Sequence, residues 1–100
     1  MSLTGKEKKY LRGIAHELEP VVAIGKNGIT DNVITAVNEA IEVHELIKVK
    51  FQYFKDEKKE LSKTLSEKTN TELCGLVGNI AILFRQNEKE DKSAYKNLRQ

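Results

Sequence analysis

The chain contains one short segment whose residue types suit anion binding, Gly25-Lys26-Asn27-Gly28 (the GKNG loop). It lies between an apolar run over residues 21–24 and a predicted helix start at Thr30. The unpaired amides and the dipole of a helix favour anions at its N-terminus, and glycine lets a phosphodiester backbone approach closely because it has no side chain. A GxxG loop of this kind clamps nucleotide backbone in some RNA-binding domains. The alternative is a tight turn that needs glycine for its positive φ.

Basic side chains gather near the N-terminus, although the chain as a whole is nearly balanced. It carries 17 Lys and Arg against 15 Asp and Glu, a net charge of +2, which is a weak overall signal for nucleic acid. On a helix over residues 4–18, Lys8, Arg12 and His16 share one face, with Lys9 beside them. We expect this basic stripe to lie close to the GKNG loop and to form one phosphate-binding surface with it. The alternative is an ordinary solvated helix face.

Hydrophobic periodicity predicts seven elements in the order α-β-α-β-α-β-β. The expected helices cover residues 4–18, 30–44 and 56–68, and the expected strands cover residues 21–24, 46–54, 72–77 and 80–85. The pattern indicates an α/β (α+β) fold, a single compact domain with a four-stranded mixed sheet packed with helices. This domain is expected over residues 1–85, followed by a polar C-terminal tail over residues 86–100 that is mobile or forms a short, weakly docked helix.

Local signals specify the ends of these elements. Thr4 with Glu7 forms a predicted capping box, while Thr30 or Asp31 and then Asp56 are the expected caps of the next two helices. Further turn and core expectations follow from the same pattern. Asn70 and the pair Gly78-Asn79 are predicted turns, Leu61 and Leu65 are the buried positions of the third helix, and Glu39, Glu42 and Glu45 make the outer side of the second helix acidic. Tyr10, Phe51, Tyr53 and Phe54 are expected in the core or the sheet rather than in a base-stacking platform.

Catalytic chemistry has little support in the sequence. His16 and His44 have no cysteine or carboxylate at metal-ligand spacing, and GKNG lacks the Ser or Thr that follows Gly-Lys in a P-loop. Cys74, the only cysteine, is expected as a buried, inert thiol. We therefore expect no catalytic residue, metal, cofactor or small-molecule substrate. Without an apolar run of roughly 18 residues or an N-terminal signal core, we expect a cytoplasmic protein that does not bind membranes.

Several separated motifs occur in a characteristic order over residues 3–85. They are Leu3-Thr4-Gly5-Lys6, Tyr10-Leu11-Arg12-Gly13, Leu18-Glu19-Pro20, Ile24-Gly25-Lys26-Asn27-Gly28-Ile29-Thr30, His44-Glu45-Leu46-Ile47-Lys48-Val49, and Gly78 followed by Ile82-Leu83-Phe84-Arg85. In this order they resemble the YhbY/CRM family of small RNA-binding domains, as a bacterial single-domain member. Such a series is far more specific than a GxxG loop alone.

The resemblance implies a fold like the C-terminal domain of translation initiation factor three and a loop like that of KH domains. It also implies RNA binding in assembly of the large ribosomal subunit, because bacterial single-domain members associate with its precursors, whereas plant relatives act in organellar intron splicing. Ribosomal RNA is then the partner, with ribosomal proteins or assembly factors as further partners. The residues expected to contact RNA are Gly25, Lys26, Asn27, Gly28, Thr30, Lys6, Lys8, Lys9, Arg12 and Arg85.

Two departures and two alternatives accompany this interpretation. The family's last strand commonly ends Leu-Tyr-Arg, whereas here Phe84 replaces the tyrosine, and Asn79 stands where relatives often carry a basic residue. Arg85 fits a structural salt bridge as well as an RNA contact. The first alternative function is a protein-interaction module that binds a ribosome assembly factor or ribosomal protein through the acidic helix or the tail. The second is a small enzyme that uses GKNG as a phosphate cradle.

Overall fold

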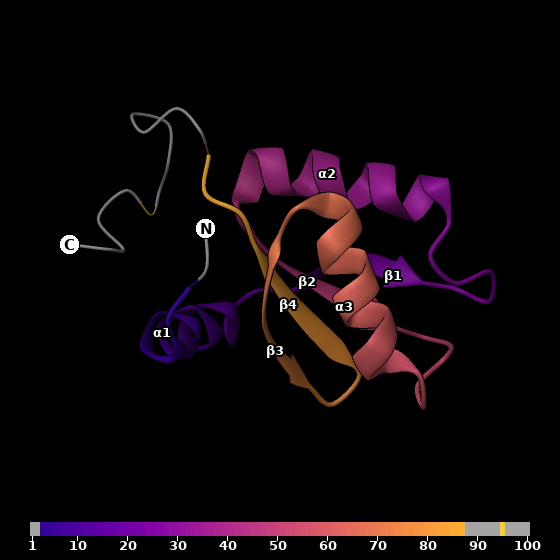
Figure 1. Cartoon of the computed structure of the whole chain (residues 1–100), viewed down its shortest axis with the longest axis horizontal. Coiled ribbons are helices and arrows are strands. Elements are labelled where there is room, and N and C mark those ends of the chain that lie inside the picture. Colours follow the sequence, from indigo (N-terminus) through magenta and orange to yellow (C-terminus); the bar gives the residue numbers. More distant parts are fainter. Residues whose placement is uncertain (1–2, 88–94, 96–100) are drawn as a thin grey trace.

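The predicted order of elements is confirmed in the computed structural model, which describes residues 3–87 and residue 95. The elements are α1 (Gly5–Ala15), β1 (Pro20–Ile24), α2 (Asp31–His44), β2 (Leu46–Phe51), α3 (Lys58–Thr69), β3 (Glu72–Val77) and β4 (Ile80–Phe84) (Figure 1). Apart from Gln86, Asn87 and Tyr95, the predicted C-terminal tail lies outside the described residues.

The four strands form one mixed sheet, as predicted, and their order in the sheet is β1-β2-β4-β3. β1 runs parallel to β2, whereas β4 runs antiparallel to both β2 and β3. β1 and β2 are joined through α2, the helical crossover that parallel strands require. Val49 of β2 lies opposite Val22 on one side and Ala81 on the other. The GKNG loop therefore leaves the sheet from an edge strand, at the end of β1.

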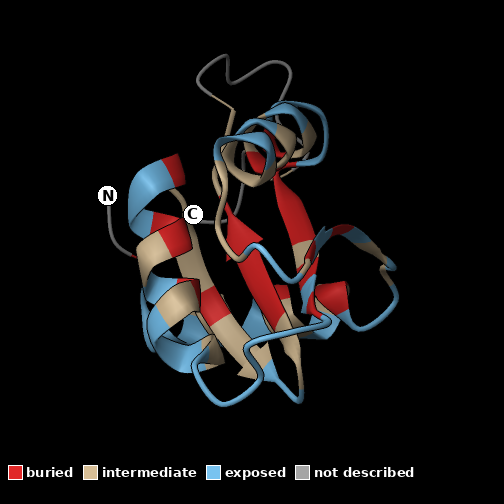
Figure 2. Ribbon diagram, turned by 90° about the vertical axis from the view of Figure 1, so that its right-hand side faces the viewer, coloured by how far each residue is buried: buried red, intermediate tan, exposed pale blue. Residues whose placement is uncertain are grey.

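Helices cover both faces of the sheet, and alternate residues of β4 are buried on each face. Ala81 and Leu83 belong to the core shared with α2 and α3, whereas Ile82 and Phe84 belong to the core beneath α1. The sequence of a strand that is buried on both faces is a continuous apolar run, whereas a strand with one exposed face alternates apolar and polar residues. Figure 1 shows α1 on one side of the sheet and the other two helices on the opposite side. In Figure 2, the buried residues lie on the strands and on parts of the helices, and many of the exposed ones lie on connecting loops and outer helix surfaces.

The predicted capping of the first two helices is confirmed. The Glu7 amide donates to Thr4 Oγ1 at 3.1 Å, and the Thr4 amide donates to Glu7 Oε1 at 2.8 Å. However, α1 ends at Ala15, three residues earlier than predicted. The amides of Glu17 and Leu18 donate to carbonyls three residues back, which tightens the last turn. The chain then extends because Pro20 disfavours helical backbone at the residue before it.

Strand β2 ends at Phe51, three residues earlier than predicted, because its partners end there. Lys50 pairs with Ile80, the first residue of β4, and Phe51 pairs with Ile24, the last residue of β1. The prediction that Tyr53 and Phe54 lie in the core or the sheet is consequently wrong. The same prediction fails for Tyr10, which is exposed on α1, and holds only for the buried Phe51. Strand β4 likewise ends at Phe84, one residue before the predicted end.

Helix α3 begins and packs differently from the prediction. Its N-cap is Glu57 rather than Asp56, and the cap makes no side-chain hydrogen bond. Asn70 ends the helix in the left-handed conformation, as expected of a turn residue. Leu65 is buried, but Leu61 is only partly so. The other buried positions are the small polar residues Ser62, Ser66 and Thr69, which let α3 lie close to its neighbours.

The acidic outer side predicted for α2 is only partly present. Glu45, the C-cap of α2, is 3% exposed and accepts a hydrogen bond from the Asn87 amide at 2.6 Å. Its positive φ of 64° turns the chain from α2 into β2, which removes its side chain from the outer helix face. Glu39 and Glu42 are exposed as expected.

Cys74 is buried, as predicted, and it lies in the core beneath α1. Burial raises the pKa of its thiol from 9.0 to about 11, while the charges of Lys8 and Arg12 oppose this rise. The thiol therefore remains protonated and inert near neutral pH. In the same core, the rings of Phe84 and Tyr95 meet edge to face, with centroids 5.3 Å apart.

Candidate nucleic-acid interface

The two glycines of the GKNG loop have different roles in the fold. The Gly28 amide donates to the Gly25 carbonyl at 3.1 Å, and Gly28 has a φ of 73°, a region that residues with a Cβ rarely adopt. Gly28 therefore closes a tight turn. Gly25 has no such positive φ, and a Cβ built on it would meet nothing within 4 Å. Neither the turn nor packing within the described chain requires glycine at position 25.

The loop leads directly into the N-terminus of α2. Thr30 is the N-cap, and its hydroxyl oxygen accepts a hydrogen bond from the Val33 amide at 3.2 Å. The hydroxyl proton remains able to donate to an anion. The helix dipole favours an anion here, but the carboxylate of Asp31 lies in the first turn and reduces that attraction. Tight binding of a phosphate at this end therefore needs a nearby cation.

Lys26 is the cation that the loop itself supplies. Lys26 and Asn27 are both exposed at the tip of the turn. Within the part of the chain that the structure describes, neither side chain makes a hydrogen bond or an ion pair. Both are therefore available to a ligand without breaking a contact of the fold.

The neighbour of the GKNG loop is the loop between β2 and α3. The Gln52 amide donates to the Ile24 carbonyl at 3.1 Å, which ties the two loops together at their start. Farther out, a Cβ built on Gly28 would lie 3.6 Å from ring atom Cε2 of Phe54. Sequence reasoning assigned the aromatic residues of this loop to the sheet and so missed their position. The available signal was the pair Tyr53-Phe54, because adjacent residues of a strand cannot both face one core.

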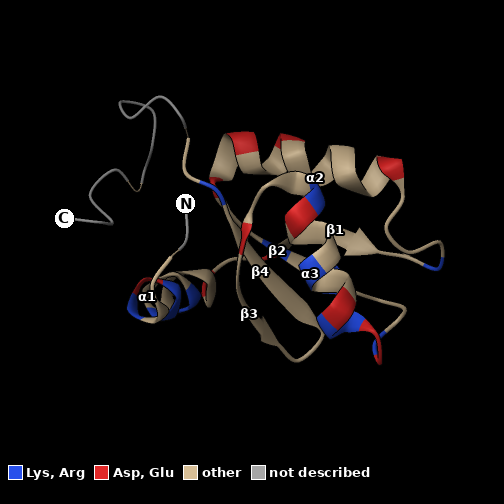
Figure 3. Ribbon diagram, viewed as in Figure 1, with Lys and Arg blue, Asp and Glu red and all other residues tan. Residues whose placement is uncertain are grey.

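The basic stripe of α1 does not lie beside the GKNG loop, so the prediction of one joint surface is wrong. Figure 3 shows the basic residues of α1 at one end of the domain and the basic tip of the β1–α2 loop at the other. The reason is topological, because α1 packs on β2 and β3 across the sheet face opposite to α2 and α3. The expected residues therefore divide into two regions, one with Gly25 to Thr30 and one with Lys6, Lys8, Lys9 and Arg12.

Arg12 is tied to the neighbouring strand. Its Nη1 donates to the Cys74 carbonyl oxygen at 2.6 Å, which fixes α1 to β3. The side chain crosses Gly75, where an added Cβ would lie only 2.5 Å from Arg12 Cδ. Gly75 thus leaves room for the arginine stem. These contacts give Arg12 a structural task and do not test its predicted contact with RNA.

Arg85 also has structural partners, and they include a salt bridge, one of the two roles predicted for this residue. Its Nη2 lies 3.2 Å from Glu42 Oε1, and its Nη1 donates to the carbonyl oxygen of Thr69 and, at 3.4 Å, to Asn38 Oδ1. The guanidinium therefore joins the end of β4 to α2 and α3. Its predicted RNA contact remains untested.

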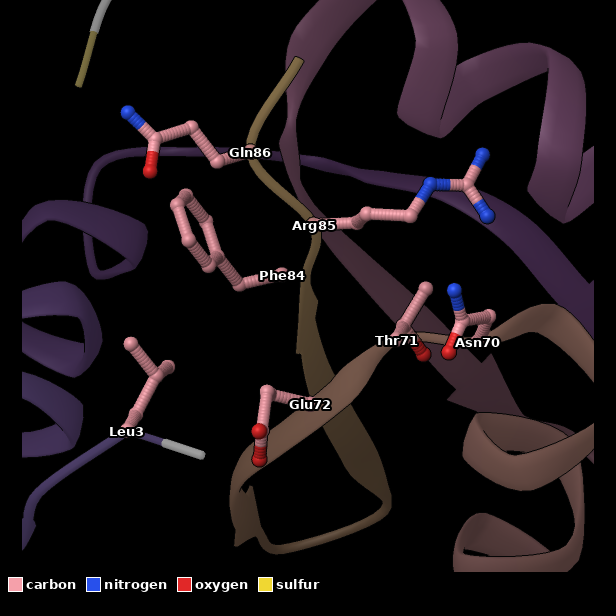
Figure 4. A pocket seen from close by; sticks show the side chains of 7 residues that line it. All are labelled: Leu3, Asn70, Thr71, Glu72, Phe84, Arg85 and Gln86. Carbon is pink, nitrogen blue, oxygen red and sulfur yellow. The ribbon is translucent and has the colours of Figure 1, made fainter. Parts of the chain in front are cut away.

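A pocket of about 210 Å³ adjoins Arg85, lined by Leu3, Asn70, Thr71, Glu72, Phe84, Arg85 and Gln86. Figure 4 shows the Arg85 side chain directed away from Leu3 and Phe84. The cavity is smaller than the roughly 300–1,000 Å³ typical of small-molecule sites. With Glu72 in its lining and the guanidinium committed elsewhere, it is poorly suited to a phosphate.

Other basic side chains are also used within the fold. Lys48 donates through Nζ to the Leu18 carbonyl at 2.9 Å, and Lys58 donates to Asn79 Oδ1 at 3.1 Å.

Among residues 3–87 and 95, no three histidine, cysteine or acidic side chains cluster as metal ligands would. Over the same residues, no helix has the length and apolar character needed to cross a bilayer.

Known proteins match this chain over most of its length. The CRS1/YhbY (CRM) domain family matches residues 3–85, which include the GKNG loop and all seven elements. The chain belongs to this family. The resemblance inferred from the separated motifs is thereby confirmed.

Individual relatives agree with this family membership. "Probable RNA-binding protein YqeI" of Bacillus subtilis is 38% identical over 91 residues, spanning 90% of this chain and 94% of that protein. A protein of Haemophilus influenzae named "RNA-binding protein" is 37% identical over 89 residues, spanning 88% and 90%. The solution structure of a Staphylococcus aureus protein, 44% identical, superposes with a TM-score of 0.78 over 88% of this chain and 93% of that one. The α+β fold predicted from sequence is therefore shared with a solved structure.

Proposed function

We propose that this protein binds RNA, without catalysis, through the end of the domain that carries the GKNG loop. The observation that carries the proposal is the geometry of Gly25, where neither a positive φ nor packing explains the missing side chain. A bare backbone beside a helix N-terminus suits the close approach of a phosphate. The names of the Bacillus subtilis and Haemophilus influenzae relatives support RNA as the ligand.

In this proposal, a phosphate lies against Gly25 and the first amides of α2, while the ammonium group of Lys26 offsets the carboxylate of Asp31. Asn27 and the Thr30 hydroxyl donate to phosphate or sugar oxygens. Contacts of this kind position RNA without reading its sequence. Affinity should therefore depend steeply on salt, and each lost phosphate contact should flatten the slope of log K against log salt by about 0.7 to 0.9.

The basic residues of α1 form a second, separate region in this proposal. Lys6 and Lys9 are exposed and Lys8 is partly exposed at the end of the domain away from the GKNG loop. A short oligonucleotide would bind at the loop alone, whereas a large folded RNA would reach both regions. Replacing these three lysines should then weaken binding of large ribosomal RNA and leave binding of a short strand nearly unchanged.

The cellular target that we propose is ribosomal RNA in a precursor of the large subunit, on the basis of the resemblance to bacterial single-domain members. The test is sedimentation of the tagged protein from cell lysate through a sucrose gradient. Lys26→Ala/Asn27→Ala is the test variant. Lys68→Ala is the matched control, because Lys68 is an exposed lysine in the last turn of α3.

Wild type and the Lys68→Ala control should co-migrate with large-subunit precursors, and the double variant should remain near the top. If both variants co-migrate equally, the loop is not the binding site. If wild type also stays at the top in low salt, the ribosomal target is wrong. If its association survives nuclease treatment, a protein partner replaces RNA.

A further inference from the structure

Two adjacent aromatic residues, Tyr53 and Phe54, lie exposed on the loop between β2 and α3. They are 53% and 39% exposed, whereas Phe51, just before them, is fully buried. Resting on the RNA-binding function proposed above, we propose that these two side chains form a stacking platform for unpaired RNA bases. The platform and the GKNG loop would hold the base and the phosphate of the same single-stranded segment.

Phe54 of the platform lies against the GKNG loop, which carries the proposed phosphate site. Ring atom Cε2 of Phe54 lies 3.6 Å from the place where a Cβ of Gly28 would be. A Cβ at position 28 would be in ordinary van der Waals contact with the ring. The Phe54 ring therefore lies beside the backbone of the GKNG loop, and RNA held by this loop passes within reach of Phe54.

The aromatic loop is held by the fold at both of its ends. The Gln52 amide bonds to the Ile24 carbonyl, and the Glu57 amide bonds to the Phe54 carbonyl at 3.1 Å. Phe54 itself has a φ of 58°, a conformation that is unfavourable for a bulky residue and persists only when the surroundings impose it. An aromatic pair that is anchored and yet exposed loses little conformational freedom when a base stacks on it.

The charges around the platform favour a nucleotide over a purely apolar ligand. Lys26 stands on the GKNG loop and Lys55 follows Phe54, and both are exposed. Asp56 and Glu57 follow Lys55 and reduce the positive charge on that side of the platform. The phosphate is therefore directed to the side of the platform that faces the GKNG loop. Aromatic rings accept any base because every base has a π-face, but in a double helix those faces are already stacked on one another. The occupant is therefore an unpaired segment, such as a loop or a bulge.

The test compares an eight-nucleotide single-stranded RNA, with one central 2-aminopurine, with the same strand in a full duplex. Tyr53→Leu keeps apolar bulk but removes the π-face, and Tyr53→Trp keeps the π-face. Tyr10→Leu is the matched control because Tyr10 is 58% exposed on α1, at the other end of the domain. Circular dichroism verifies that all variants are folded.

Wild type should bind the single strand more tightly than the duplex and quench the 2-aminopurine. Tyr53→Leu should weaken binding roughly five-fold to one-hundred-fold, the range that stacking of one base implies. Its salt slope should not change, because no phosphate contact is lost. Tyr53→Trp and Tyr10→Leu should bind as wild type does.

Equal binding by Tyr53→Leu and wild type, or equal binding of duplex and single strand, would overturn the platform while leaving RNA binding intact. Equal losses in Tyr53→Leu and Tyr10→Leu would also overturn it, because the effect would then not be local to this loop. Failure of wild type to bind the octamer, its duplex and ribosomal RNA would overturn the proposed function, and the platform with it.

Discussion

Substituting the two glycines of the GKNG loop separates a requirement of the fold from a requirement of binding. In Gly25→Ala, the new methyl group enters open space and the backbone needs no positive φ. The native state is therefore not strained, and the loss of unfolded-state freedom should leave stability unchanged or raise it by up to about 1 kcal/mol. In Gly28→Ala, the φ of 73° should cost roughly 1–2 kcal/mol. The methyl group adds no clash, since it would lie 3.6 Å from Phe54.

For RNA binding, the expected order is reversed. The Gly25 methyl would occupy the space that we assign to a phosphate, and a lost charge-assisted hydrogen bond costs about 1.5–3 kcal/mol, or roughly ten-fold to one-hundred-fold in affinity. Folded Gly28→Ala protein should lose less RNA affinity than Gly25→Ala. Its methyl group contacts the Phe54 ring instead of filling the open space that we assign to the phosphate.

The assays are thermal unfolding by circular dichroism and titration of the same RNA by fluorescence anisotropy. For a domain of this size, about 1 kcal/mol corresponds to roughly 4–8 °C in the unfolding midpoint. We expect Gly28→Ala to unfold several degrees below wild type and Gly25→Ala at or above it. A Gly25→Ala protein that binds RNA like wild type would refute the reasoning, as would one that is destabilised as much as Gly28→Ala.

Three further predictions concern residues away from the loop. Gly13→Ala should raise stability by about 0.5–1 kcal/mol, measured by urea unfolding, because Gly13 is mid-helix and a Cβ would meet nothing within 4 Å. Ser62→Ala should raise the thermal midpoint by several degrees, because the buried Ser62 hydroxyl has no partner among the described residues. Cys74 has a raised pKa of about 11, so the unfolded thiol ionises first and stability is lost as pH rises from 9 to 11. Cys74→Ala should remove roughly 2–3 kcal/mol of that decline in urea unfolding.

The parts of the fold that depend on neighbouring residues in the chain were predictable from sequence. The caps at Thr4 and Thr30 are such features, because their hydrogen bonds reach only three residues along the chain. The hairpin turn at Gly78 is another, with a positive φ of 59°. In each case the signal and its structural consequence lie in the same few residues.

The end of β2 was not predictable in this way, because it depends on distant partners. Apolar and polar residues continue to alternate past Phe51, but Ile24 and Ile80 offer no pairing beyond it. Tyr53 and Phe54 are exposed for that reason. The local pattern still favoured a strand at the point where the sheet had ended.

The division of the candidate site also required the tertiary structure. The basic stripe of α1 was visible in the sequence, but the sheet face on which α1 packs was not. Arg12 illustrates the difficulty, because its partner carbonyl at Cys74 lies 62 residues along the chain. A stripe of basic residues shows that one helix face is positively charged, but it does not show where that face lies on the folded domain. Only the packing shows that this charge lies at the end of the domain opposite the GKNG loop.

The most direct test of the central claim is a ¹H–¹⁵N correlation spectrum of the protein titrated with a short single-stranded RNA. We expect the amide signals of Gly25, Lys26, Asn27 and Gly28 to shift first and furthest, together with those of Tyr53 and Phe54, while signals of α1 change little. Shifts confined to α1 or to the outer face of α2, with the GKNG signals unmoved, would contradict it.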